Sequence, residues 1–437
     1  MNKGSKLWKK ALDLIPGGNG LLSKRPERFH PEEWPTYYKS AKGCKVVTLD
    51  NKTYYDFTQM GVGSCIFGYN YEPLNREVIK SIKKSVNTTL NCPEEVELAK
   101  LLLKSDKFAG SVKFARSGGE AMGIAVRIAR AASGRDKVAF SGYHGWKDWY
   151  LASNIKNKKA LDKQLLPGLS VIGVPGSLKN TSIPFLYNSI ESFHDVIKKN
   201  DDIGVICIEG ARGEYPNRKF ISEITKIARR KKIILICDEI TSGWRMANGG
   251  SYKITGIKPD IVVYGKGMGG GFAISAVVGK KKIMDFAQNT FISSSMWTER
   301  VGFVAGLNSI KIFKQLKLWK KINKIGFKIK KNWQIIAKKT GINIKVNEVN
   351  ALISFKFLYG DKNLLIETIF ISKMLEYGFL ASTSVYPCLA HTDIVLNKYF
   401  KNVEKTFKFL YEEIHYRDFK DFNKTKIRSD AFKRLSN

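Results

Sequence analysis

Two ionisable residues stand at the carboxyl ends of short apolar runs and could do chemistry together. Asp238 follows the run 233–237, and Lys266 follows the run 261–264 on the glycine-rich segment 265–271. Short runs of β-branched residues predict buried strands. Open parallel α/β sheets bind their ligands at the carboxyl ends of the strands. The two side chains are therefore candidates for a single site.

A lysine and a carboxylate in this arrangement supply what pyridoxal phosphate chemistry needs. The amine can form a Schiff base with the cofactor, and the carboxylate can keep the pyridine nitrogen protonated so that the ring accepts electrons. The alternative is that Lys266 is one of the many surface lysines of a basic chain. The pair alone does not decide between these interpretations, so other strand ends must supply further evidence.

Composition narrows the class of protein. With 437 residues, 43% of them hydrophobic, the chain can bury a large core and is expected to hold a large and a small domain. No apolar run approaches the length of a membrane span and no signal-like segment opens the sequence, so we expect a cytoplasmic protein without a membrane partner. The six cysteines form no CxxC pair and the five histidines show no ligand spacing, so no metal site is expected.

The net charge of +35 raises the alternative of nucleic-acid binding. The lysines are spread along the chain and are densest from 311 to 339, where apolar residues recur every three or four positions. That pattern predicts an amphipathic helix with lysines on its solvated face, with a possible break near Gly326. We expect no nucleic-acid partner, although a positive field can attract anionic substrates.

The order of predicted elements indicates an α/β protein. Alternating apolar residues around a turn predict a β-hairpin over 44–57, and residues 6–14 are a possible helix. Strands and helices then alternate from about 95 to 300, which predicts a largely parallel sheet with helices on both faces. The expected strands are 111–115, 137–140, 204–208, 233–237 and 261–264, and the expected helices between them include 120–132 and 222–231. We expect 1–55 to join the small domain, 56–310 to form the large domain, and 311–437, with a strand near 351–357, to complete the small α+β domain.

Three further strand ends carry functional residue types. Ser117-Gly118-Gly119 leads into a helix whose free amides could cradle a phosphate, although a tight turn with a serine cap explains it equally well. Tyr143 and His144 follow the next strand, where an aromatic ring could stack on a flat cofactor or could simply pack on the core. Glu209 ends the strand after that. Four functional types at successive strand ends are much less probable by chance than any one of them.

These segments resemble the class III pyridoxal-phosphate-dependent aminotransferases, and within them the glutamate-1-semialdehyde aminomutase-like branch. The similar motifs are Ser-Gly-Gly-Glu-Ala, Tyr-His-Gly, Asp-Glu-Ile-Thr-Ser-Gly-Trp-Arg (238–245) and Gly-Lys-Gly-Met-Gly-Gly-Gly, and they run in the family's order from about 22 to about 415. The resemblance implies a fold-type I enzyme, with a mostly parallel seven-stranded type of sheet between helices, that works as a homodimer with active sites at the subunit interface.

By position, the resemblance implies a role for each matched residue. Lys266 matches the Schiff-base lysine and Asp238 the partner of the pyridine nitrogen, and these two are the expected catalytic residues. The remaining expected cofactor-binding residues are Ser117, Gly118, Gly119, Tyr143, His144, Glu209 and Ser295. Ser295 aligns with a threonine that reaches the phosphate of the neighbouring subunit, and its alternative role is to cap the helix that follows. Glu209 precedes Gly210 where the family has proline.

Several residues differ from those that the family has at the same positions, and these differences affect which substrate we expect. Ser117-Gly118-Gly119 stands for Ser-Gly-Thr, so one hydroxyl is lost. Val62 aligns with the aminomutase's tryptophan near the substrate, and the carboxylate-binding arginine falls at either Arg25 or Arg28. These changes favour an aminotransferase with a small amine or amino-acid donor and an aldehyde or ketone acceptor. The aminomutase itself remains the alternative.

Three other classes of protein make different predictions from this interpretation. A nucleic-acid-binding protein would be colourless and would bind DNA with a steep salt dependence. A non-catalytic protein of the same fold would be expected to lack the lysine or the aspartate, and both are present. A dinucleotide-binding dehydrogenase would carry a glycine fingerprint that this sequence lacks.

Overall fold

A computed structural model describes residues 2–164 and 166–430. Contacts within the chain divide it into two units, Glu72–Lys320 and Met1–Tyr71 with Lys321–Asn437. The boundaries expected from sequence, after residues 55 and 310, fall earlier along the chain than those two. The assignment of three parts to two domains stays a prediction.

The large unit is built on a seven-stranded sheet with the order β4-β10-β9-β8-β7-β5-β6. Only β10 is antiparallel to its neighbours, β4 and β9, among the pairs that the structure describes. All residues of β7, β8, β9 and β10 are buried, which explains their continuous apolar runs. The strands are β4 Ser111–Ala115, β5 Lys137–Ser141, β6 Ser182–Pro184, β7 Ile203–Glu209, β8 Ile234–Asp238, β9 Ile261–Tyr264 and β10 Ser275–Gly279. The predicted mostly parallel sheet is confirmed.

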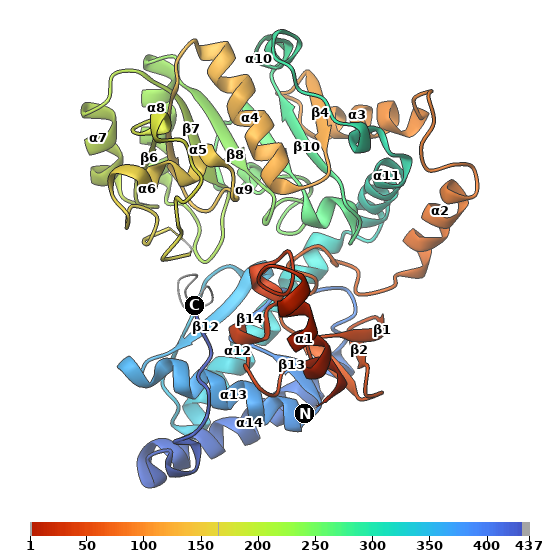
Figure 1. Cartoon of the computed structure of the whole chain (residues 1–437), viewed down its shortest axis with the longest axis vertical. Helices are drawn as coiled ribbons and strands as arrows, with labels where there is room; N and C mark the ends of the chain where they lie inside the picture. Colours follow the sequence, from red (N-terminus) through yellow and green to blue (C-terminus); the bar gives the residue numbers. More distant parts are fainter. Residues whose placement is uncertain (1, 165, 431–437) are drawn as a thin grey trace. The chain divides into compact units, whose positions relative to one another are not determined.

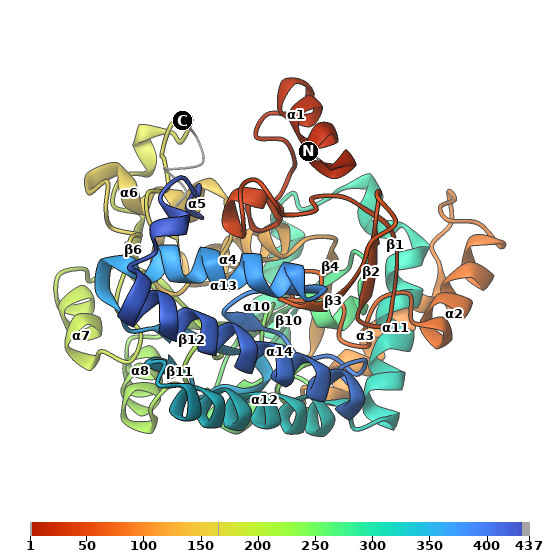
Figure 2. The same cartoon turned by 90° about the horizontal axis from the view of Figure 1, so that it is seen from below.

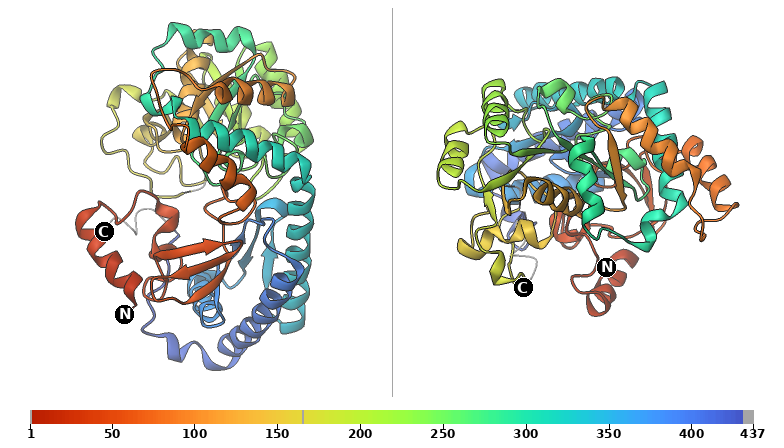
Figure 3. Two further views of the ribbon diagram at one scale, coloured as in Figure 1. Left: turned by 90° about the vertical axis from the view of Figure 1, so that its right-hand side faces the viewer. Right: turned by 90° about the horizontal axis from the view of Figure 1, so that it is seen from above.

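Helices cover this sheet on both faces (Figures 1 and 3). The long helix α4 packs across β7, β8, β9 and β10, and its apolar residues form one core with theirs. The helices of this unit are α2 Glu72–Ile82, α3 Pro93–Ser105, α4 Gly118–Ser133, α5 Asp148–Leu151, α6 Ser153–Lys156, α7 Ile190–Lys198, α8 Arg218–Arg230, α9 Tyr252–Thr255, α10 Lys281–Met284 and α11 Arg300–Gln315.

The other unit is an α+β assembly with two small sheets. A four-stranded sheet has the order β1-β2-β3-β13, and a three-stranded sheet has the order β11-β12-β14. The predicted hairpin is the antiparallel pair β2 and β3. Helices α13 and α14 lie side by side (Figure 2). The strands are β1 Tyr38–Lys42, β2 Lys45–Thr48, β3 Thr53–Phe57, β11 Ile344–Val346, β12 Ile353–Phe357, β13 Phe379–Ala381 and β14 Ser384–Val385, and the helices are α1 Lys3–Leu14, α12 Leu318–Thr340, α13 Asn363–Glu376 and α14 Asp393–Glu412.

The predicted helix break at Gly326 is wrong. Helix α11 ends at Gln315, Lys317 takes a left-handed φ of 47°, and α12 then runs without interruption through Gly326. A Cβ atom on Gly326 would come within 1.8 Å of the carbonyl oxygen of Asn350. The glycine is there because another segment packs tightly on the helix, which its sequence neighbours do not reveal.

No helix in the described part of the chain combines the length and the apolar character needed to cross a bilayer.

Candidate active site

Lys266 lies between β9 and β10, where the chain turns sharply. Gly265 is extended, and Lys266 has a left-handed φ of 44° and begins the 3-10 turn Lys266–Gly269. A non-glycine residue in this conformation is uncommon and is held there by its surroundings. The Nζ atom of Lys266 donates a hydrogen bond of 2.9 Å to the hydroxyl of Thr241. The turn therefore fixes the direction of the amine.

The environment of Lys266 favours its neutral form. Burial lowers the pKa of the ammonium group from 10.5 to about 8, and the nearby Arg212 guanidinium acts in the same direction. Asp238 and Glu209 partly oppose this shift. Because a lower pKa leaves more free amine near neutrality, Lys266 is suited to act as a nucleophile and as a base.

Asp238 ends β8 and lies beside Glu209 of β7 in the register of the sheet. Its side chain is buried, one oxygen accepting from the Ile240 N–H at 3.0 Å and the other lying 2.8 Å from His144 Nδ1. The second nitrogen of His144 lies 3.2 Å from the carbonyl oxygen of Ser141. Both ring nitrogens thus face oxygen atoms, which fixes the orientation of the imidazole ring. The contact with His144 therefore holds the Asp238 carboxylate in one orientation.

Two residues of the cluster, Thr241 and Arg212, were not among the sequence predictions. Arg212 contacts Glu209 at 2.9 Å and donates to the Thr241 hydroxyl at 3.3 Å. Since Thr241 also accepts from Lys266, its own proton remains available to a third group. Thr241 lies inside the quoted motif 238–245, so its position carried a signal. For Arg212, the only signal in the sequence was its spacing of three residues from Glu209.

Close packing around Glu209 explains two neighbouring glycines, Gly142 and Gly210. Its Oε2 accepts a long hydrogen bond of 3.4 Å from the Tyr143 N–H, and a Cβ atom on Gly142 would lie 2.6 Å from that oxygen. A Cβ atom on Gly210 would lie 2.2 Å from the Ser251 hydroxyl, and the Gly210 N–H donates to the Asp238 carbonyl at 3.0 Å. Proline has no N–H to donate, so glycine fits here where the family has proline.

Tyr143 is half-buried at the end of β5, next to the Glu209 carboxylate. Its ring meets that of Tyr150 edge-on with a centroid distance of 5.7 Å, and burial raises the pKa of its hydroxyl. The ring lies on the same edge of the sheet as Asp238 and Glu209. Its predicted stacking on the cofactor remains a prediction.

The turn before α4 combines both interpretations of its sequence. Ser117 caps the helix, accepting from the Glu120 N–H at 3.4 Å and donating its hydroxyl proton to Glu120 Oε2 at 2.9 Å. The amides of Gly118 and Gly119 belong to the first turn, where a helix has no internal acceptors to offer. A Cβ atom on Gly118 would lie 2.8 Å from Ile240. The turn is therefore both a capped helix start and a set of amides suited to a phosphate.

Ser295 is exposed and does not cap α11. It begins the 3-10 turn Ser295–Thr298, and Glu299 is the residue that caps the helix, accepting from the amides of Val301 at 2.5 Å and Gly302 at 3.2 Å. The capping alternative for Ser295 is therefore wrong. Its hydroxyl stays accessible, and its contact with a second subunit stays a prediction.

Arg116 ties this segment to the phosphate turn within one chain. Its guanidinium donates to the carbonyl oxygens of Met296 at 2.7 Å and Trp297 at 3.2 Å, and it lies 3.4 Å from the Glu299 carboxylate. Sequence reasoning did not single out Arg116, because its partners lie far along the chain.

Arg25, Arg28 and Val62 belong to the other unit. Arg28 donates to the Ser429 carbonyl at 2.9 Å, and burial together with Arg428 lowers the pKa of Arg28 to about 10. The Arg25 guanidinium lies so close to Gly17 that a Cβ atom there would be 1.9 Å from it. Val62 has a left-handed φ of 56°, which is unusual for a β-branched residue. The assignment of these three residues to the substrate stays a prediction.

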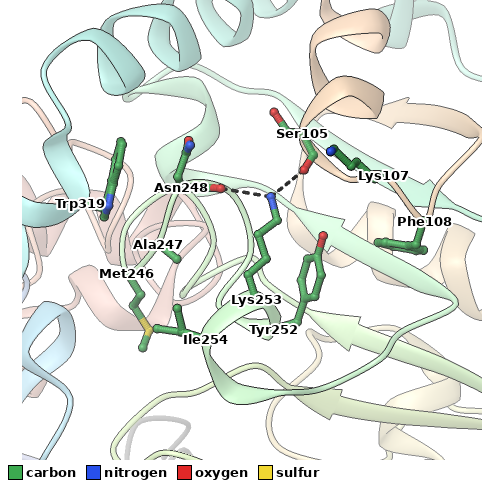
Figure 4. Close-up of a pocket in the computed structure, with 10 residues that line it drawn as sticks. All are labelled: Ser105, Lys107, Phe108, Met246, Ala247, Asn248, Tyr252, Lys253, Ile254 and Trp319. Carbon is green, nitrogen blue, oxygen red and sulfur yellow. Dashed lines mark hydrogen bonds between the residues drawn. The ribbon is translucent and has the colours of Figure 1, made fainter.

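A hollow of about 620 Å³ opens elsewhere on the large unit (Figure 4). The Lys253 ammonium extends across it and donates to the carbonyl oxygens of Ser105 at 2.7 Å and Asn248 at 3.1 Å. It also contacts the buried Asp106 at 3.1 Å. No predicted site residue lines this hollow, and the bonds of Lys253 tie together the surrounding loops.

The strand-end residues fit the parts of pyridoxal phosphate. The Gly118 and Gly119 amides suit the phosphate, the buried Asp238 suits a protonated pyridine nitrogen, and the partly neutral Lys266 amine suits the aldehyde. A glycine at 142 and another at 118 keep side chains out of the space at this edge of the sheet.

Comparisons with known proteins agree with this chemistry. A glutamate-1-semialdehyde 2,1-aminomutase of Campylobacter hominis is 32% identical over 97% of this chain and 96% of its own length. A 3-aminobutyryl-CoA aminotransferase of Cloacimonas acidaminovorans is 28% identical over 89% of this chain and 92% of its own. The FumI protein of Sphingopyxis sp. MTA144 has a similar fold, with a TM-score of 0.85 and 20% identity over 95% of this chain and 98% of that one. Residues 29–396 match the family described as aminotransferase class-III. The chain therefore belongs to the class-III aminotransferase family, whose members depend on pyridoxal phosphate.

Proposed function

We propose that this enzyme moves an amino group from a small amine or amino-acid donor to an aldehyde or ketone acceptor. The observation that carries the proposal is the Lys266 amine, which is oriented by Thr241 at 2.9 Å and has a pKa lowered to about 8. It shares one edge of the sheet with Asp238. A structural lysine would need neither the strained turn nor a lowered pKa.

Different residues of this chain have different roles in the proposed amino transfer. When bound, pyridoxal phosphate supplies a carbonyl that reacts with amines and a ring that accepts an electron pair from the substrate carbon. Lys266 removes the proton from that carbon and later returns a proton, which is the role of a general acid and base. Asp238, held by His144, keeps the pyridine nitrogen protonated. The first-turn amides at Gly118 and Gly119 hold the phosphate in place.

Arg212 and Glu209 set the charge around the reacting amine. Arg212 lowers the pKa of Lys266, whereas Glu209 raises it. Because these two side chains are paired at 2.9 Å, a ligand that binds either one alters the balance between them. We propose that this pair tunes the fraction of neutral Lys266 during turnover.

A second candidate is glutamate-1-semialdehyde 2,1-aminomutase, in which the amino group moves between neighbouring carbons of one molecule. The 32% identity to a relative of that name over nearly the whole chain favours it. Val62, in place of the aminomutase's tryptophan, argues against it. The substrate requirement separates the two, since an aminotransferase needs a donor and a separate acceptor whereas an aminomutase converts a single substrate without a second one.

We further propose a homodimer in which Ser295 reaches the phosphate bound by the partner subunit. The exposed position of Ser295 and the resemblance to the family support this. Light scattering combined with absorbance tests it, since a monomer that binds the cofactor at full affinity would contradict a shared site. Ser295→Ala should weaken cofactor binding by about 1.5–3 kcal/mol, which is typical of a hydrogen bond to a charged group. The six free cysteines, four of them buried, support a reducing cytoplasm as the location.

The direct test of the proposed function begins with the purified protein and its cofactor. Borohydride reduction followed by peptide mass spectrometry should place pyridoxal phosphate on Lys266. A screen of amines by absorbance should then identify donors that convert the bound cofactor to its amine form. A colourless protein with no modified Lys266 would contradict the proposal.

A further inference from the structure

The phosphate turn of this enzyme is poor in side-chain donors. Gly119 has no hydroxyl, and the Ser117 hydroxyl already donates to Glu120 Oε2 at 2.9 Å. The Glu120 carboxylate also accepts from the Ser117 N–H at 2.8 Å. A phosphate at this turn would therefore meet backbone amides but neither of the hydroxyls that a Ser-Gly-Thr turn would offer. Charged acceptors bind best when several donors converge on them.

The indole edge of Trp146 lies over Gly119. A Cβ atom on Gly119 would be 3.3 Å from both Cδ1 and Nε1 of Trp146. This is the edge of the ring that carries the N–H, and it lies where a hydroxyl-bearing side chain at position 119 would extend. A Cβ atom on Gly145, which has a φ of 100°, would be 3.2 Å from the Gly119 Cα atom. The loop can approach the turn this closely because both positions are glycine.

The Trp146 N–H is available to a ligand. The side chain is 65% exposed although it is a large aromatic. Within residues 2–164 and 166–430 its Nε1 makes no hydrogen bond, whereas Trp297 Nε1 donates to Glu120 at 3.3 Å. An exposed indole N–H is hydrated, and a ligand that offers an acceptor can replace that water. The donor of Trp146 thus faces the turn without a protein acceptor.

Lys147 adds positive charge beside the indole. Its ammonium lies 4.6 Å from the centroid of the Trp146 ring. Its aliphatic stem runs along α4, where its Cγ atom would be 3.7 Å from a Cβ atom on Gly123. A cation and an N–H donor therefore flank the start of the same helix, whose own amides favour anions.

We propose that the Trp146 indole N–H is a side-chain donor to the cofactor phosphate and takes the place of the hydroxyl that Gly119 lacks, with Lys147 adding charge. This inference rests on the proposed function and names a residue that positions the cofactor. The alternative role for Trp146 is an apolar wall that makes no polar contact with the ligand. The two roles predict different affinities, because only a donor role makes the contribution of Trp146 depend on the phosphate group of the ligand.

The test compares ligands with and without the phosphate. Trp146→Phe keeps an aromatic wall but removes the N–H. Equilibrium dialysis of the apoenzyme should show about a tenfold higher Kd for pyridoxal phosphate, which is the loss of one hydrogen bond to a charged group. The Kd for pyridoxal, which has no phosphate, should stay unchanged. Inorganic phosphate should also compete less well with pyridoxal phosphate for the variant.

A rescue experiment separates the missing donor from general damage. Gly119→Ser in the natural background should not improve affinity, because the indole already lies 3.3 Å from the new Cβ atom. In the Trp146→Ala background, Gly119→Ser has room and should recover most of the lost affinity for pyridoxal phosphate but none for pyridoxal. Trp319→Phe is a matched control, since this tryptophan lines the hollow of Figure 4 and should leave both affinities unchanged.

The outcomes distinguish this inference from the proposed function. An unchanged Kd for pyridoxal phosphate in Trp146→Phe, or an equal loss for pyridoxal, would overturn the role of Trp146. The natural enzyme would still carry its cofactor on Lys266 in either case. If borohydride fixes no cofactor on Lys266 of the natural enzyme, the proposed function itself is wrong.

Discussion

Asp238 and Glu239 are consecutive carboxylates at the end of β8, yet their surroundings differ. Glu239 is completely buried and accepts from the Ser242 hydroxyl at 2.5 Å, the Ser251 hydroxyl at 2.8 Å and the Tyr252 N–H at 2.7 Å. Asp238 has one backbone donor at 3.0 Å and His144 at 2.8 Å. A carboxylate offers about four acceptor positions, so Asp238 keeps capacity for a ligand, whereas Glu239 is nearly saturated.

Glu239 belongs to a wider network that fixes loops. Tyr252, which donates its N–H to Glu239, donates its hydroxyl to the buried Asp106 at 2.6 Å, and Tyr264 donates to the same Asp106 at 3.0 Å. Burial raises the pKa of Glu239. Asp238 instead shares its strand-end edge with Glu209. A buried acid whose donors all come from its own protein is structural, while one with unused acceptors beside a strained lysine is functional.

The largest expected effect tests the functional side of this comparison. Lys266→Ala should lower turnover by about 10³-fold or more, because general acid–base catalysis alone contributes 10²–10⁴-fold. The cofactor should bind only non-covalently, as shown by its loss on dialysis after borohydride treatment. The urea midpoint of the apoenzyme should not fall, since the variant removes a desolvated cation. Turnover near that of the natural enzyme would remove Lys266 from the mechanism.

The next largest effect is expected for Asp238→Asn. A neutral amide keeps the size of the side chain but cannot stabilise a protonated pyridine, so turnover should fall by about 10²-fold or more. The cofactor should still attach to Lys266, as mass spectrometry after reduction would show. If turnover barely changes while the urea midpoint falls, Asp238 is structural like its neighbour and the comparison fails.

The pH dependence of the free energy of unfolding should reveal how much the buried Lys266 ammonium destabilises the folded protein. Its pKa of about 8 in the folded apoenzyme lies below 10.5, so below pH 8 the folded state holds a desolvated charge that the unfolded state holds in water. The penalty is fully present there and is lost as the pH rises from about 8 to 10.5. At 1.36 kcal/mol per pKa unit it is at most about 3 kcal/mol, since the partly exposed side chain keeps some water. The difference in unfolding free energy between the natural apoenzyme and Lys266→Met should shrink over that pH range, and a constant difference would contradict the lowered pKa.

The smallest expected effect tests the structural role of Glu239. Glu239→Gln turns an acceptor into a donor that faces other donors, and should lower the free energy of unfolding by about 1–3 kcal/mol. The urea midpoint of the apoenzyme measures this. The Kd for pyridoxal phosphate should change much less than in Asp238→Asn. A loss of cofactor binding without loss of stability would place Glu239 in the active site instead.

Much of the large unit could be predicted from the sequence. Strands 111–115 and 261–264 have the expected bounds, and the other strands predicted for this unit differ from the structure by one residue at one or both ends. Buried parallel strands produce continuous apolar runs, and such runs can be recognised in the sequence without knowledge of the tertiary contacts. Lys266 and Asp238 could be singled out because each directly follows such a run.

Tertiary structure decided the contacts that act across the chain. The contacts of Arg212 with Thr241, of Arg116 with Met296 and of Trp146 with Gly119 join distant segments, and no periodicity identifies them. The sequence near Gly326 predicts a break, but contact with Asn350 requires the glycine inside a continuous helix.

The sequence by itself thus determined which residues stand at the strand ends, because backbone hydrogen bonding and burial impose a local pattern. Only the tertiary structure decided that Asp238, and not the adjacent Glu239, keeps acceptor positions free for a ligand. Hydrogen bonds to Asp238 and Glu239 come from residues up to 94 positions away, and their geometry exists only once the sheet and its loops have packed.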